Sequence, residues 1–191
     1  MRVGIADLMN RQHVLFGTEM GRACLARMVA ETRETQEPEA LFLDFGDVAA
    51  ATVSFLREGP LAYRRLLRER DSNVYPVFSN LAPPVMDSLG EYLRSTRDAV
   101  FACQFSAADG ATQVRVLGQL ETKQKLTFDA VHALGEVTAA QLAHERWGED
   151  RVGVTAWSNR LAALADKGLV MVNRVGRRKS FRLTLEVAQW A

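Results

Sequence analysis

The chain has 191 residues, of which 48% are apolar, and its 24 basic and 23 acidic side chains leave a formal net charge of +1. This length suits one large or two small domains, and the apolar content is sufficient for buried cores. No apolar run approaches the roughly 18 to 20 residues that cross a bilayer, and the first residues lack the basic and apolar regions of a signal peptide, so we expect a soluble cytoplasmic protein.

The first 120 residues alternate apolar runs with segments of helical periodicity. Strands are expected over 3–8, 40–45, 74–78, 99–105 and 113–117, and helices over 18–32, 54–70 and 83–96. Gly59 and Pro60 should kink or split the helix over 54–70. Asp109 and Gly110 form a hairpin turn before the last strand. This alternation predicts an α/β layer with a mixed sheet.

Charged side chains in this half have structural interpretations. The second part of the helix over 54–70 carries a cluster of arginines, Arg64, Arg65, Arg68 and Arg70, which we interpret as a solvated face; docking of an acidic partner or an extended DNA footprint is the alternative. Asp44 and Asp47 lie near one strand end without a third ligand or a histidine, so they are interpreted as cap and turn residues rather than as a cation site or an acid pair.

Residues 121–191 predict three helices and a β-hairpin. The helices are expected over 125–134, 139–147 and 155–166, the second opened by Thr138. In the third helix, Thr155 is the expected N-cap, and a buried stripe is formed by Trp157, Leu161, Leu164 and Ala165. Gly168 should end this helix in a left-handed conformation.

Polar and basic side chains gather on the outward side of this segment. The third helix places Thr155, Ser158, Asn159 and Arg160 opposite its buried stripe, near its N-terminus. The hairpin over 174–182 turns at Gly176 and carries Arg174, Arg177, Arg178, Lys179 and Arg182 with no acid among them. Such a helix can meet base edges in the major groove of DNA, and such a hairpin can meet phosphates.

The charge balance differs between the two parts of the chain. Residues 1–120 carry 13 arginines against 15 acids, and residues 121–191 carry 11 basic residues against 8 acids. The basic excess therefore lies with the helices and hairpin. It is small, which favours a focused contact of the hairpin with nucleic acid over a broad basic surface.

Residues 121–185 resemble the winged helix-turn-helix domains of bacterial transcriptional regulators, particularly the arsenic-responsive repressor family. The residues that carry the resemblance are Gly168-Leu169-Val170, Arg174, Gly176-Arg177-Arg178 and Phe181-Arg182-Leu183. The resemblance implies a recognition helix over 155–166, a basic wing over 174–182 and double-stranded DNA as ligand. Winged helices also serve as protein-docking modules.

Residues 1–118 resemble STAS-like domains, relatives of the sulfate transporter and anti-sigma factor antagonist fold. The residues that carry the resemblance are Leu43-Asp44-Phe45-Gly46-Asp47-Val48, Thr52-Val53-Ser54-Phe55 and Asn80-Leu81-Ala82-Pro83. In anti-sigma antagonists a serine at the place of Ser54 is a regulatory phosphosite. Val53 and Phe55 depart from the usual acidic and glycine neighbours, and the alternative is that Ser54 caps its helix.

The sequence contains no motif for catalysis or for metal binding. His13, His132 and His144 are scattered, and Cys24 and Cys103 have no metal-ligand neighbours, so no metal or cofactor is expected and both cysteines are interpreted as buried thiols. No glycine-rich phosphate loop and no nucleophile with its base is present, so an enzyme is not expected.

The sequence predicts an α/β STAS-like interaction domain over 1–120 and an α+β winged helix-turn-helix domain over 121–191. The expected function is transcriptional regulation through DNA, as a homodimer joined by the first domain, the segment around Trp190, or both. The alternatives are an adaptor that partners an ATPase or kinase through its STAS-like domain, and a small-molecule sensor.

Overall fold

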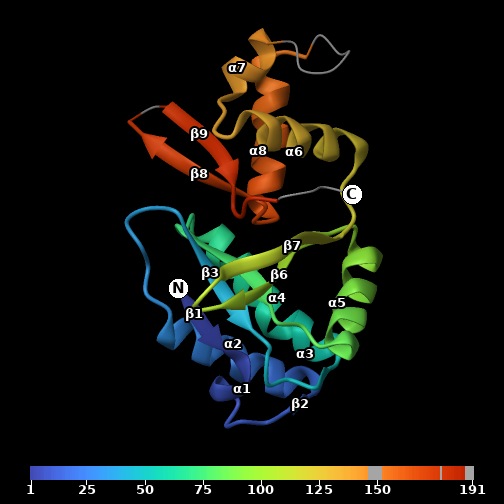
Figure 1. Ribbon diagram of the computed structural model, residues 1–191. Helices are drawn as coiled ribbons and strands as arrows, with labels where there is room; N and C mark the ends of the chain where they lie inside the picture. Colours follow the sequence, from blue (N-terminus) through green and yellow to red (C-terminus); the bar gives the residue numbers. More distant parts are fainter. Residues whose placement is uncertain (146–151, 177, 188–191) are drawn as a thin grey trace.

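The computed structural model describes residues 1–145, 152–176 and 178–187 as a five-stranded sheet with helices on both faces (Figure 1). The α/β unit (residues 1–118) contains β1 (Arg2–Gly4), α1 (Ile5–Leu8), β2 (Val14–Leu15), α2 (Gly17–Glu31), β3 (Glu39–Asp44), β4 (Ala50–Ala51), α3 (Val53–Glu58), α4 (Pro60–Glu69), β5 (Val74–Ser79), α5 (Pro83–Thr96), β6 (Ala99–Ser106) and β7 (Gly110–Gly118). The C-terminal unit (residues 122–187) contains α6 (Thr122–Leu134), α7 (Ala139–His144), α8 (Val154–Asp166), β8 (Val170–Val175) and β9 (Arg178–Leu183).

The main sheet has the strand order β1-β3-β5-β6-β7. The first four of these strands are parallel to their neighbours, and β7 pairs antiparallel with β6 through the hairpin that ends at Gly110. The mixed sheet predicted from the sequence is therefore confirmed. Two short pairs, β2–β4 and β8–β9, form separate sheets.

The central strands are buried on both faces. In β6, Val100 and Ala102 belong to one hydrophobic cluster, while Phe101 and Cys103 belong to a second. Successive side chains of a strand point to opposite faces, so the two clusters lie on the two sides of the sheet. An uninterrupted apolar run such as Ala99–Cys103 is typical of a strand covered on both sides.

Helices of the α/β unit cover the first face. The expected helix over 54–70 is split into α3 and α4 at Gly59, and Pro60 begins α4. Gly21 brings α2 close to α3, because a Cβ at this position would lie 2.8 Å from the carbonyl oxygen of Phe55. The close approach explains why a side-chain-free residue is needed in the middle of α2.

The C-terminal unit covers the second face, above the sheet in Figure 1. Phe128 of α6 packs on Phe101 of β6 with 6.0 Å between ring centroids. Trp157 and Leu161 of α8 are buried in the same cluster. The two units thus share one hydrophobic core, which the sequence interpretation as two separate domains did not anticipate.

The largest difference from the predicted elements lies near the N-terminus. A strand was expected over 3–8, but β1 ends at Gly4 and α1 follows. Ile5, Ala6 and Leu8 of α1 are buried. Periodicity cannot distinguish a strand from a short buried helix in an apolar run of this length.

Candidate nucleic-acid interface

The interpretation of the sequence depends on which residues of helix α8 are buried and which are exposed. Its buried residues are Trp157, Leu161, Leu164 and Ala165, as predicted. The expected cap is wrong: Gly153 is the N-cap, no side chain caps the helix, and Thr155 lies exposed within the first turn. Gly168 follows the helix with a φ of 75°, which confirms the left-handed stop.

Neutral polar side chains occupy the outer face of α8. Ser158 and Asn159 are exposed and line a cleft together with Val154, Ala162 and Asp166 of the same helix. A hydroxyl and a carboxamide can each donate and accept hydrogen bonds. This face can therefore bind groups of mixed hydrogen-bonding character, and it contributes no cation to the lining of the cleft.

Arg160 does not lie on this exposed outer face of α8. Its guanidinium carbon lies 5.0 Å from the centroid of the Trp157 ring. Its Nη1 atom is buried and has no hydrogen-bond partner among the described residues. The residue is half-buried and does not line the cleft, in contrast to its expected outward orientation.

The β8–β9 hairpin carries the basic residues. Gly176 turns the chain with a φ of 61°, and Arg178 and Lys179 are exposed beyond it. Phe181 anchors β9, because its backbone pairs with Val137 and its side chain is buried. The predicted contact residue Arg177 lies outside the described residues.

Arg174 is engaged by the α/β unit. Its Nη1 and Nη2 atoms donate to the two carboxylate oxygens of Asp71 at 3.2 and 2.8 Å. These hydrogen bonds hold the pKa of Asp71 below its usual range and raise that of Arg174. The side chains are 72% and 47% exposed, respectively, so solvent screens this ion pair.

A cleft of about 1460 Å³ lies where these elements meet. Its walls are α8, the hairpin, the start of α7 and, from the α/β unit, residues 36–38 and 71–73 together with Arg68 and Tyr75. Its charged lining residues are Arg68, Arg174, Arg178, Lys179, Glu37, Asp71 and Asp166. The cations of the hairpin thus face acids that come largely from the α/β unit.

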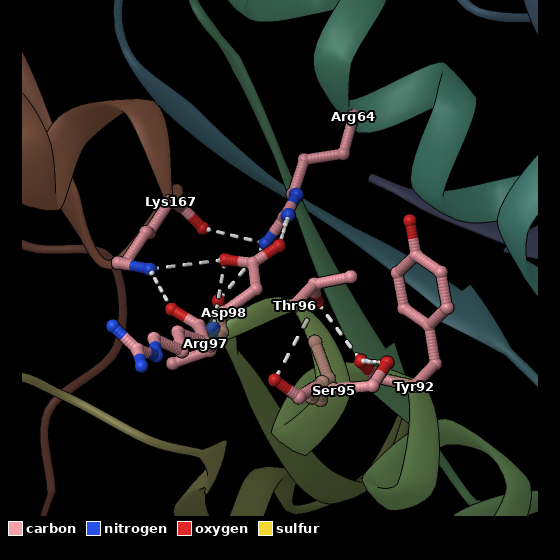
Figure 2. A network of polar contacts seen from close by, with 9 residues as sticks. Arg64, Tyr92, Ser95, Thr96, Arg97, Asp98 and Lys167 are labelled. Carbon is pink, nitrogen blue, oxygen red and sulfur yellow. Dashed lines mark hydrogen bonds and ion pairs between the residues drawn. The ribbon is translucent and has the colours of Figure 1, made fainter.

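A buried arginine fixes α8 relative to the sheet (Figure 2). Arg64 of α4 is 5% exposed, forms an ion pair with Asp98, and donates to the carbonyl oxygens of Ala99 at 2.9 Å and Lys167 at 3.1 Å. The Lys167 ammonium in turn lies 3.3 Å from Asp98. Arg64 therefore connects α4, β6 and the end of α8, where a solvated side chain was expected.

A further hydrogen bond joins the units. The N–H of Val172 in β8 donates to the hydroxyl of Tyr75 in β5 at 2.9 Å. Arg68 lies over the Tyr75 ring at 3.9 Å, and its guanidinium donates to the carbonyl oxygens of Ser72 and Val74. Arg68 is thus also a structural residue, whereas Arg65 and Arg70 are exposed as expected.

The residues of the first-half motifs have local roles. Thr52 is the N-cap of α3 and accepts from the N–H of Phe55, while the Ser54 hydroxyl lies 3.0 Å from that of Thr52, so the expected cap at Ser54 is wrong. The buried carboxylate of Asp44 accepts from Arg2, from the side chain of Asn80 and from the N–H of Gly46.

Few side chains of the described residues are candidates for catalysis or metal binding. Burial raises the pKa of Cys24 to about 12 and, with the charge of Asp44, that of Cys103 to about 11, which confirms both as buried thiols. The described residues contain no group of three or more potential metal ligands. Within the same ranges, no helix is long and apolar enough to cross a membrane.

Comparisons with protein-family models, with curated proteins and with solved structures yield no match for this chain.

Proposed function

We propose that this protein is a transcriptional regulator that binds double-stranded DNA through its C-terminal unit. In this proposal α6, α7, α8 and the hairpin form a winged helix, with α8 as recognition helix and β8–β9 as wing. The observation that supports it best is the shared cleft, because the polar face of α8 and the cations of the hairpin converge there. A duplex offers base edges to hydrogen-bonding side chains and phosphates to cations.

We infer different roles for helix α8 and for the hairpin. Ser158 and Asn159 would read base edges, since their side chains are exposed and hydrogen-bonding groups discriminate bases in the major groove. Arg178 and Lys179 would bind phosphates, which are the sequence-independent part of a DNA interface. Arg160, stacked on Trp157, would support the helix rather than read a base.

The α/β unit is proposed to be a STAS-like interaction module. Its mixed sheet and the helix that begins after Thr52 are consistent with the sequence resemblance. In this role it would receive a signal or a protein partner, and its shared core with the C-terminal unit would transmit the effect to α8.

A mobility-shift assay tests the proposal. Duplex DNA from the promoter region of the protein's own gene is titrated with the full chain at 50 and 200 mM salt, beside a random duplex of equal length. We expect tighter binding to a promoter fragment and a marked loss of affinity at the higher salt concentration. Lack of binding to every duplex at low salt would refute the proposal.

Two single substitutions in α8 test the roles of its residues. Asn159→Ala should weaken binding to the specific site by about 1 to 3 kcal/mol while random DNA is affected little. Arg160→Ala should leave both affinities nearly unchanged and lower the melting temperature instead, because it removes the contact with Trp157. The reverse pattern would return base reading to Arg160.

A protein-docking adaptor is the second candidate function. It is favoured by two exposed apolar side chains at the cleft, Val154 at 49% and Val175 at 70% exposure. Exposed apolar residues that line one cleft can mark a protein interface. This candidate gains support if the folded chain binds no duplex.

A further inference from the structure

Asp71 forms an ion pair with one cation of the basic hairpin. In the register of β8 and β9, Arg174 lies directly opposite Lys179. Opposed residues of an antiparallel pair point to the same side, so these two cations project together from one face of the hairpin. Asp71, in the turn after α4, contacts Arg174 and is close enough for an electrostatic interaction with Lys179.

The geometry of the contact is that of an arginine bound to an oxyanion. Both terminal nitrogens of Arg174 donate to the two oxygens of Asp71, a fork arrangement that guanidinium groups also form with phosphate. The carboxylate therefore fills a position that a DNA phosphate oxygen could take. It comes from the α/β unit, 103 residues away in the sequence.

The contact is also weak enough to exchange. With 72% of the Asp71 side chain and 47% of the Arg174 side chain exposed, solvent screens the ion pair and hydrates both groups when they separate. This contrasts with the buried pair of Arg64 and Asp98, which is 6% and 20% exposed. Of these two ion pairs, the outer one can open without unpairing a buried charge.

We propose that Asp71 is an internal competitor for DNA, holding Arg174 in the free chain and giving it up to a phosphate when duplex binds. The inference rests on the proposed function and adds the α/β unit to the DNA interface. The carboxylate lowers the affinity for every sequence and reduces non-specific binding. Any event at the turn after α4 that moves Asp71 changes the DNA affinity of the hairpin.

The test compares charge-removing variants of the full chain. Fluorescence anisotropy with a labelled random duplex measures affinity at several salt concentrations for the wild type and Asp71→Asn. Asparagine suits the position because Asp71 has a φ of 54°, a region that asparagine adopts readily. Glu69→Gln is the matched control, since it removes the same charge two residues away from an exposed side chain.

We expect Asp71→Asn to bind random duplex about two- to fivefold more tightly at low salt. The log affinity against log salt plot should steepen, because salt screens the ion pair that the wild type must break and the gain therefore shrinks as the salt concentration rises. Glu69→Gln should leave the slope unchanged. In an Arg174→Ala background, the gain from Asp71→Asn should disappear, since the cation it would release is absent.

The outcomes separate the inference from the proposed function. If the wild type binds duplex and Asp71→Asn binds with equal affinity and slope, the inference is overturned and the proposed function stands. A gain that Glu69→Gln reproduces, or that persists without Arg174, also overturns it. If all variants are folded by circular dichroism and none binds duplex at low salt, the proposed function fails and the inference fails with it.

Discussion

Arg64 is a buried side chain that joins the C-terminal unit to the α/β unit. Arg64→Ala would leave Asp98 and the carbonyl oxygens of Ala99 and Lys167 without their buried donor. We expect it to lower the free energy of unfolding by about 3 to 5 kcal/mol. Urea denaturation measures the change. Arg65→Ala, an exposed neighbour on α4, should stay within about 0.5 kcal/mol, and similar effects for both would contradict this role.

The same ion pair predicts a pH dependence. Burial alone would raise the pKa of Asp98, but Arg64, the N–H of Ala99 and Lys167 outweigh it and lower the pKa below the ordinary 3.8. A carboxyl with a depressed pKa stabilises the fold above its unfolded pKa, and this stabilisation is lost as the pH falls through its folded pKa.

Stability should therefore be level above about pH 5 and decline below about pH 4. Unfolding free energies from pH 2.5 to 6 for the wild type and Asp98→Asn measure it. The variant should be less stable at pH 6 and should lose less on acidification, since its side chain does not titrate. Parallel pH profiles would show that other carboxyl groups cause the decline.

At the scale of elements, the hairpin is expected to supply the salt dependence of DNA binding. Arg178 and Lys179 are exposed, and each phosphate contact contributes about 0.9 to the slope of log affinity against log salt. Replacing both by alanine should weaken binding to all sequences and flatten the slope by about 2. Anisotropy at several salt concentrations is the measurement, with Arg65→Ala/Arg94→Ala as a control of equal charge. An unchanged slope would remove the hairpin from the interface.

Local signals in the sequence predicted most elements well. Pro83 and Pro60 each begin a helix, and Gly168 and Gly176 adopt the left-handed conformations that their positions required. These features depend on a few neighbouring residues, which is why they can be predicted. The caps at Thr155 and Ser54 failed because a nearby Gly153 or Thr52 was equally compatible with the pattern.

Long-range placement could not be predicted in the same way. The sequence predicted a strand over 99–105, but nothing in this run identifies the C-terminal unit as the cover of its second face. Arg64 and Arg174 looked like solvated or DNA-binding cations because their partners, Asp98 and Asp71, are distant in the sequence. Trp190 lies outside the described residues, so its predicted part in a homodimer stays a prediction.

At the scale of the whole molecule, the shared core restricts how a dimer can form. Both faces of the sheet are covered within one chain, so a second copy must contact an edge or the outer surface of a helix. Val14 of β2 and Phe16, the residue before α2, are 55% and 60% exposed, and exposed apolar neighbours of this kind favour an interface. A single winged helix reads few base pairs, so two copies on a symmetric site are expected.

We therefore expect the chain to be a homodimer at micromolar concentration, joined through the α/β unit. Light scattering of the full chain measures the mass, with and without duplex. Phe16→Ser should shift the mass toward the monomer, whereas Val175→Ser, which removes a 70% exposed apolar side chain from the hairpin, should leave the dimer intact. A monomer under all conditions would contradict the dimer and favour the adaptor, in which a different protein covers the α/β unit.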